Sequence, residues 1–160
     1  MKKITIHLTV DGRLYRLETE PNKTLLYLLR DELGVHGVKD ACGQEGECGA
    51  CTVLMDGKPV NSCLVLAGQA NGRQIVTIEG LCTDGELHPL QRAFVEAGAV
   101  QCGYCTPGAV LSASYLLEHD PHPTEEQIRE ALAGNLCRCT GYSKMVSAVR
   151  RAAEEISYGQ

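Results

Sequence analysis

Apolar and polar residues alternate along the first part of the chain. In residues 2–10 the apolar side chains occupy every second position, which predicts a strand with one buried face. Asp11 and Gly12 follow, a pair that favours a tight hairpin turn, so residues 13–18 are predicted to return as a second strand. The chain is therefore expected to begin with a β-hairpin.

After this hairpin the apolar pattern changes to the period of a helix. Leucines recur at helical spacing between residues 25 and 33, with Asn22 or Thr24 as the candidate N-cap and Gly34 placed to end the helix. The pattern predicts one amphipathic helix that packs against the hairpin.

The segment that follows is predicted to complete a small sheet. Residues 40–49 are rich in glycine and acidic residues and have no periodicity, which indicates a loop. Residues 51–55 and 74–78 are predicted strands, with a hairpin turn at Asp56-Gly57 and a short helical turn over residues 63–67. The first part of the chain is thus expected to form a small mixed sheet that clasps one helix.

The second half is predicted to be helical. Thr106 is expected to cap one helix ahead of Pro107, and Thr124 with Gln127 forms a capping box for another. The predicted helices cover residues 90–97, 107–118, 125–133 and 144–156. The fold class is therefore expected to be α+β, with a sheet domain over residues 1–80, a linker near 81–87 and a helical domain over 85–160.

Composition and charge exclude several classes of protein. The 160 residues include 15 Lys+Arg and 20 Asp+Glu, and a net charge of -5 argues against nucleic-acid binding. The hydrophobic fraction of 44% is that of a globular protein, and no apolar run approaches the roughly 18 residues of a membrane helix. The first residues lack the continuous apolar stretch of a secretory signal, so a cytoplasmic protein is expected.

Cysteine is the unusual component, with nine residues against one Phe and no Trp. Clustered thiols in a reducing compartment favour metal binding over a disulfide framework, and the odd count agrees with that interpretation. Bound metal could also supply part of the folding free energy of two modest cores.

One set of four cysteines lies in the first half, with the spacing C-x5-C-x2-C-x11-C: Cys42, Cys48, Cys51 and Cys63. Gly43, Gly46 and Gly49 lie among them, and a loop around an inorganic cluster needs tight turns that point N–H groups at the sulfurs. The pattern is close to the C-x4-C-x2-C of plant-type 2Fe-2S ferredoxins. A structural zinc site is the alternative.

A second set lies in the helical half, with the spacing C-x2-C-x31-C-x-C: Cys102, Cys105, Cys137 and Cys139. The helices that follow Cys105 and Gly141 would place unpaired N–H groups and positive dipole ends near an anionic thiolate cluster. By spacing alone, zinc remains a serious alternative to iron for this set.

Three segments together resemble the small iron–sulfur subunit of the molybdenum hydroxylases, the family of xanthine, nicotinate and carbon monoxide dehydrogenases, and the resemblance spans essentially the entire chain. The segments are EGECGACTV at residues 45–53, QCGYCTPG at 101–108 and GNLCRCTGY at 134–142. The resemblance implies a β-grasp ferredoxin-like domain and a four-helix domain, each with a 2Fe-2S cluster bound by one cysteine set. The family usually has four residues between the first two cysteines, whereas five separate Cys42 from Cys48 here, so the loop must bulge.

The resemblance also implies a function and a set of partners. Electrons would pass from a molybdopterin, in its cytosine dinucleotide form, on a large subunit through the helical-domain cluster and then the ferredoxin-domain cluster to FAD on a medium subunit. Gln101 would contact the pterin, no bond-making residue is expected in this chain, and the assembly would be a dimer of heterotrimers. The substrate, whether purine, nicotinate-like heteroaromatic, aldehyde, aromatic thioester or carbon monoxide, and the final electron acceptor are not readable from the sequence.

Two other classes of protein stay open at this point. A free-standing two-cluster ferredoxin-like carrier would use the same cysteines, and a zinc-stabilised adaptor would use them without redox chemistry. Cys82, the ninth cysteine, belongs to neither set and is expected to be a buried structural thiol in the linker.

Overall fold

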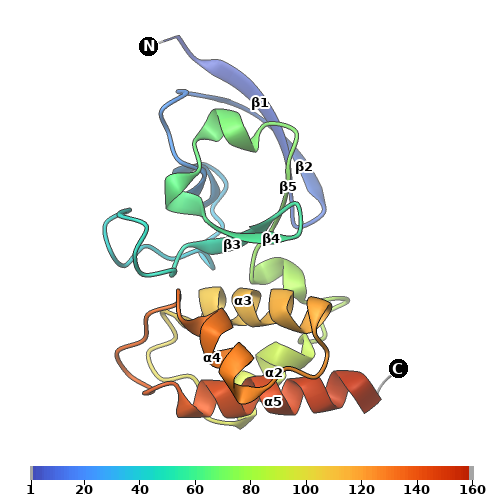
Figure 1. Ribbon diagram of the computed structural model, residues 1–160. Helices are drawn as coiled ribbons and strands as arrows, with labels where there is room; N and C mark the ends of the chain where they lie inside the picture. Colours follow the sequence, from blue (N-terminus) through green and yellow to red (C-terminus); the bar gives the residue numbers. More distant parts are fainter. Residues whose placement is uncertain (1, 159–160) are drawn as a thin grey trace.

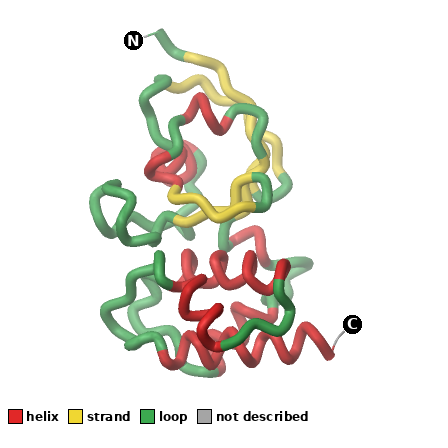
Figure 2. Tube along the Cα trace, viewed as in Figure 1, coloured by secondary structure: helices red, strands yellow, loops and turns green. Residues whose placement is uncertain are grey.

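The computed structural model describes residues 2–158, so the first residue and the last two residues of the predicted domains lie outside the described part. The chain forms two stacked parts, a sheet part with the N-terminal end and a helical part with the C-terminal end (Figure 1). All strands lie within residues 4–76 and the longer helices within residues 89–158 (Figure 2). This is the predicted α+β arrangement. None of the helices in residues 2–158 is both long and apolar enough to cross a membrane.

The sheet has five strands in the order β2-β1-β5-β3-β4, with β1 and β5 parallel and the other neighbours antiparallel. The strands are β1 (Ile4–Val10), β2 (Arg13–Thr19), β3 (Thr52–Met55), β4 (Lys58–Asn61) and β5 (Gln74–Val76). Both predicted Asp-Gly hairpin turns form, with Asp11, Gly12, Asp56 and Gly57 at positive φ. The mixed sheet wraps one helical segment, as expected for a ferredoxin-like domain.

That helical segment begins where the sequence predicts it. The hydroxyl of Thr24 accepts a hydrogen bond from the N–H of Tyr27 at 3.2 Å, so Thr24 is the N-cap of α1 (Leu25–Tyr27). The helix continues as the wider π-turn η1 (Leu28–Glu32), and Gly34 follows at φ +72°. The predicted short helical turn is divided into η2 (Ser62–Leu64) and η3 (Ala67–Ala70).

Strand β5 ends two residues before its predicted end, and the reason is a side-chain contact. The carboxylate of Asp11 accepts hydrogen bonds from the N–H and the hydroxyl of Thr77, both at 2.7 Å. Because these bonds satisfy the backbone of Thr77 outside the sheet, the chain leaves the sheet there and enters η4 (Glu79–Leu81).

The helical part contains the four predicted helices, α2 (Pro89–Glu96), α3 (Thr106–His119), α4 (Glu125–Leu132) and α5 (Ser143–Tyr158). The predicted capping box of α4 forms, because Thr124 and Gln127 each accept a hydrogen bond from the other's backbone N–H. The predicted cap at Thr106 is wrong. Thr106 is already the first helical residue of α3, and Cys105 takes the N-cap position without a side-chain bond.

The two parts meet through a close backbone contact beside the cysteines. Asn135 is only 3% exposed, and its side-chain amide donates to the carbonyl of Gly49 at 3.0 Å and to the hydroxyl of Thr52 at 3.3 Å. A Cβ on Gly108 of α3 would overlap the carbonyl oxygen of Gly49, and a Cβ on Gly49 would overlap the carbonyl oxygen of Gly134. The junction therefore depends on residues without side chains at these positions.

We expect Gly108→Ala to destabilise the junction, because the new methyl group meets fixed backbone rather than a flexible side chain. Overpacking of this kind costs about 1–3 kcal/mol. Thermal unfolding of the protein with its clusters bound measures the effect. Gly68→Ala is the matched control, since its Cβ would lie at an ordinary 3.6 Å from Ile4. Equal unfolding temperatures for the two variants would contradict this view of the junction.

Candidate metal centres

The first cysteine set lies around a loop that projects from the sheet part (Figure 1). Cys42 is half-buried in this loop. The other three are buried: Cys48 at the far end of the loop, Cys51 directly before β3, and Cys63 in η2. The thiols of Cys42 and Cys48 lie close enough for Cys48 to lower the pKa of Cys42, and those of Cys51 and Cys63 lie close enough for Cys51 to raise the pKa of Cys63. The fold thus brings all four predicted residues together as two neighbouring pairs.

The loop of the first set turns back on itself through left-handed backbone conformations. Gly43, Gly46 and Gly49 have φ of +74°, +78° and +67°, and the non-glycine residue Gln44 has +70°. Gly43 and Gln44 are consecutive, so the bulge that five intervening residues require lies here. The hydroxyl of Thr24 donates to the side-chain oxygen of Gln44 at 3.2 Å and holds the bulge against the N-terminus of α1.

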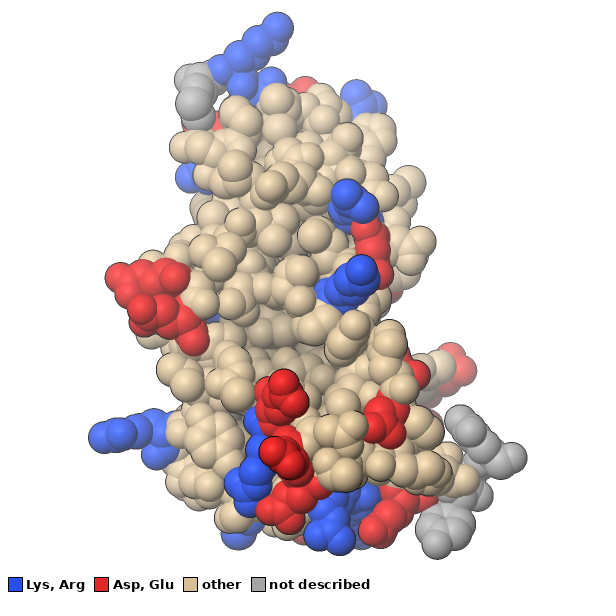
Figure 3. Space-filling model, in the orientation of Figure 1, with Lys and Arg blue, Asp and Glu red and all other residues tan. Residues whose placement is uncertain are grey.

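This conformation aims backbone N–H groups at sulfur. The N–H groups of Glu47 and Cys48 donate to the Cys42 sulfur and lower the pKa of that thiol to about 6. Burial has the opposite effect on Cys63 and raises its pKa to about 12. Figure 3 shows acidic side chains grouped on the projecting loop, and the exposed acidic residues of this loop are Glu45 and Glu47. The loop therefore presents amide dipoles inward and carboxylates outward.

The second set lines one cavity at the end of the helical part. All four predicted cysteines of this set, Cys102, Cys105, Cys137 and Cys139, line a cavity of about 180 Å³. The sulfurs of Cys102 and Cys139 lie 3.6 Å apart and are exposed. The thiols of Cys105 and Cys137 form the inner pair, and burial raises the pKa of Cys105 to about 12.

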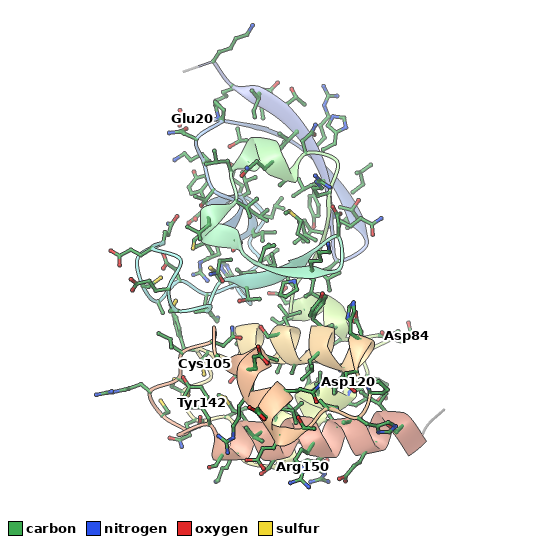
Figure 4. All side chains as sticks on the ribbon, viewed as in Figure 1. Glu20, Asp84, Cys105, Asp120, Tyr142 and Arg150 are labelled. Carbon is green, nitrogen blue, oxygen red and sulfur yellow. The ribbon has the colours of Figure 1, made fainter. Side chains whose placement is uncertain are left out.

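Cys137 is the cysteine of the second set whose sulfur and backbone N–H both make hydrogen bonds to nearby residues. Burial alone would raise its pKa, but hydrogen bonds from the hydroxyl and the N–H of Thr140, at 3.1 and 3.4 Å, lower the pKa to about 7. Its own N–H donates to the hydroxyl of Tyr142 at 2.7 Å. Tyr142 has a φ of +68°, an uncommon conformation for an aromatic residue. Figure 4 shows Cys105 and Tyr142 at the same end of the helical part, away from Asp84.

The pairing of the thiols bears on the choice between zinc and iron–sulfur sites. A tetrahedral zinc site brings four sulfurs within 2.3 Å of one metal ion, whereas a 2Fe-2S cluster is held by four thiolates shared between two iron atoms. Among residues 2–158, no three His, Cys, Asp or Glu side chains converge as a single metal ion requires. Each set is instead divided into two pairs, which fits a binuclear cluster.

Cys82 lies apart from both sets, as the sequence predicts, but it is not buried. It is exposed in the linker after η4, where its thiol donates to the side-chain oxygen of Gln91 at 3.3 Å. The expectation of a buried structural thiol is wrong because residues 82–87 are all exposed, and only Leu81 of the predicted linker packs against the helical core.

Gln101 is exposed beside Cys102, together with the apolar residues Val100, Tyr104 and Leu136. No hydrogen bond from its amide to local backbone occurs within the described residues, so nothing there ties the amide to a purely structural role. The hydroxyl of Tyr104 crosses to the other loop and donates to the carbonyl of Asp40 at 2.7 Å.

The contacts that join the two sets were not foreseen from the sequence. The N–H of Leu136 donates to the carbonyl of Cys48 at 2.9 Å, so residues adjacent to or within the two ligand sets are directly hydrogen-bonded. Asn135 makes the neighbouring contact to Gly49 across 86 positions of the chain. Local patterns along the sequence carry no signal for such distant pairs.

Comparison with known proteins agrees with this geometry. Residues 8–75 match the family model of the 2Fe-2S iron-sulfur cluster binding domain, and residues 77–150 match that of the 2Fe-2S binding domain. The nicotinate dehydrogenase small FeS subunit of Eubacterium barkeri is 56% identical over 154 residues, which cover 96% of this chain and 98% of that protein. The xanthine dehydrogenase iron-sulfur-binding subunit of Escherichia coli O157:H7 is 46% identical over 148 residues, covering 91% and 92%. A chain in the crystal structure of quinoline 2-oxidoreductase from Pseudomonas putida 86 has a TM-score of 0.93 and 40% identity, with 99% of both chains covered.

Two consecutive 2Fe-2S domains, each with a four-cysteine set, define a two-domain electron-transfer protein. Within this class the chain belongs to the family of small iron–sulfur subunits of the molybdenum hydroxylases. It is a subunit of a dehydrogenase or oxidoreductase complex and transfers electrons through its 2Fe-2S domains. The zinc interpretations are set aside.

We expect about four iron atoms and four acid-labile sulfides per chain, because each four-thiolate set suits one 2Fe-2S cluster. Cys82→Ala should leave the iron content and both electron paramagnetic resonance (EPR) signals unchanged, since its thiol contacts only Gln91 among the hydrogen bonds of the described residues. Metal analysis and EPR of the reduced protein test both statements. Zinc in place of iron, or loss of one signal in Cys82→Ala, would show that the ligand sets are misassigned.

Proposed function

We propose that this chain relays electrons from a molybdopterin-binding subunit to a flavin-binding subunit. The second cysteine set would receive the electrons and the first set would pass them on. When bound, a 2Fe-2S cluster accepts and donates one electron at a time. Hydroxylation of a C–H bond with oxygen from water releases two protons and an electron pair, so the relay would operate twice for each product molecule.

We further propose that the eight cysteines of the two sets are the ligands of two clusters. The pairing of the thiols supports this assignment, since each pair would hold one iron atom. Burial keeps Cys63 and Cys105 protonated without metal, because it raises the pKa of each to about 12. Binding of iron would displace these protons and so contribute to folding of both loops.

The observation that carries the proposal is the direct contact between the two sets. The N–H of Leu136, which precedes Cys137, donates to the carbonyl of Cys48 at 2.9 Å. One hydrogen bond and a few covalent bonds therefore connect a proposed ligand of one cluster to a proposed ligand of the other. The exposure of Cys102 and Cys139 supports electron entry at the second set, because these thiols are open to a partner.

The exposed residues around Cys102 support the position of the molybdopterin partner. Leu136 is 56% exposed and Tyr104 is 43% exposed, and apolar side chains of this size favour burial against another protein. Gln101 lies on the same face, and its amide offers donors and an acceptor to a heterocycle edge without adding charge. Gln101 would thus orient the pterin beside the second cluster.

The remaining features of the assembly follow the relatives. The Eubacterium barkeri relative is a nicotinate dehydrogenase subunit and the Escherichia coli relative a xanthine dehydrogenase subunit, so we propose a heteroaromatic or related substrate bound by the large subunit. We propose a pterin in the cytosine dinucleotide form, FAD on a medium subunit, and a dimer of heterotrimers in the cytoplasm. Co-purification with the tagged chain tests whether it belongs to a complex, because a free-standing carrier would purify without partner subunits.

The order of the two clusters can be tested by removing one ligand at a time. Cys48→Ala should abolish the ferredoxin-type EPR signal and stop reduction of the flavin by substrate, because electrons could no longer leave the second cluster. Cys137→Ala should instead disturb the signal of the cluster nearest to molybdenum. Anaerobic reduction of the assembled complex, followed by absorbance and EPR, measures both effects. Flavin reduction that persisted in Cys48→Ala would contradict the proposed order.

We expect Gln101→Ala to retain full iron content but to slow reduction of the clusters by substrate. Loss of a hydrogen bond worth about 1 kcal/mol corresponds to a roughly fivefold slower electron entry. Stopped-flow reduction by substrate and by dithionite is compared in parallel, because dithionite does not require an oriented pterin. If the variant is as fast as the unmodified protein with both reductants, Gln101 has only a structural role.

A further inference from the structure

Three hydrogen bonds join Cys137, Thr140 and Tyr142 in a ring that includes the sulfur of Cys137. The N–H of Cys137 donates to the hydroxyl of Tyr142 at 2.7 Å, and the N–H of Tyr142 donates to the hydroxyl of Thr140 at 3.3 Å. The hydroxyl of Thr140 in turn lies 3.1 Å from the sulfur of Cys137. We call these three residues the Thr140 ring.

The ring fixes the direction in which the Thr140 hydroxyl donates. Its oxygen already accepts the N–H of Tyr142, and a metal-bound thiolate has no proton to give. The hydroxyl proton must therefore point at the Cys137 sulfur. The N–H of Thr140 approaches the same sulfur at 3.4 Å, so one residue provides two donors to one proposed ligand.

Backbone geometry maintains the ring. Tyr142 adopts a φ of +68°, which places its N–H toward Thr140 and its hydroxyl toward the backbone of Cys137. A non-glycine residue in this conformation carries an energetic cost that its surroundings must offset. The outer pair, Cys102 and Cys139, is exposed instead and has no side-chain hydroxyl donor among the described residues.

We propose that the Thr140 ring raises the reduction potential of the second cluster and localises its added electron on the iron held by Cys105 and Cys137. The inference rests on the proposed ligand assignment. Hydrogen bonds to ligand sulfur stabilise the additional negative charge of the reduced state. The step is a one-electron change from two ferric ions to one ferric and one ferrous ion, with no bond broken and no proton transferred.

The location of that iron gives the ring a role in the relay. Cys137 directly follows Leu136, whose N–H is bonded to the carbonyl of Cys48. An electron on the iron that Cys105 and Cys137 would hold would therefore be linked through Leu136 to Cys48 of the first set. Thr140 is a positioning residue in this sense, since it acts on the electron through Cys137.

A redox titration followed by EPR tests the proposal on the purified complex. Both clusters are observed in the same sample, so the first cluster is an internal reference. Thr140→Val removes the hydroxyl but keeps the shape of the side chain and the backbone N–H. When one electron is shared between the two clusters, the fraction on the second cluster relative to the first should fall roughly three- to tenfold. A tenfold shift corresponds to 59 mV for a one-electron couple.

Two variants serve as controls. Thr140→Ser retains the hydroxyl and should stay within about twofold of the unmodified protein, because the donor to sulfur is restored. Thr106→Val alters a threonine that also adjoins a cysteine of the second set, Cys105, but whose hydroxyl donates to no sulfur among the described residues. It should leave the distribution unchanged. An unshifted potential in Thr140→Val would overturn the proposal.

If Thr140→Val does not retain the second cluster, a second variant tests the role of the Thr140 ring. Tyr142→Phe removes the acceptor of the Cys137 N–H and opens the ring, so it should shift the distribution in the same direction, roughly two- to fivefold. No shift in Tyr142→Phe would then overturn the proposal. A wrong ligand assignment would be recognised separately, because in that case Cys137→Ala would leave the EPR signal of the second cluster intact.

Discussion

The arrangement of the whole molecule depends on one close contact between backbones. The buried amide of Asn135 reaches across to the carbonyl of Gly49, and Gly108 packs so tightly there that a methyl group would not fit. A buried amide must find its partners, so the contact fixes the position of one part against the other. Because Gly49 lies between Cys48 and Cys51, and Asn135 lies two residues before Cys137, the same contact fixes how the two cysteine sets face each other. Electron transfer depends steeply on distance, which makes this contact functional as well as structural.

Each cysteine set combines two kinds of thiol. In the first set, N–H groups lower the pKa of Cys42 to about 6 while burial raises that of Cys63 to about 12. In the second set, donors from Thr140 lower the pKa of Cys137 to about 7 against the effect of burial, while burial raises that of Cys105 to about 12. If these thiols bind iron as proposed, binding would displace protons from the buried ones, so the affinity for iron would depend on pH.

Local chemistry explains which features the sequence could predict. Alternating residues, Asp-Gly turns and the Thr124 capping box depend on neighbours along the chain, and all of these formed as expected. The end of β5 was missed because it depends on Asp11, 66 positions away from Thr77. Thr106 was misassigned because α3 begins one residue earlier than predicted, with Cys105 at the N-cap position and no side-chain bond there. The cysteines of the site were readable from their spacing, whereas Asn135 and the Thr140 ring depend on contacts that only the folded chain creates.

In the proposed relay, electrons from the substrate cross both cysteine sets before they reach the flavin. Rapid freeze-quench EPR of the complete complex, mixed anaerobically with substrate in the absence of a terminal acceptor, follows this order in time. We expect the signal of the second cluster to appear first and the signal of the first cluster to follow, before or together with reduction of the flavin. Flavin that becomes reduced while either cluster stays oxidised throughout the first turnover would overturn the proposed relay.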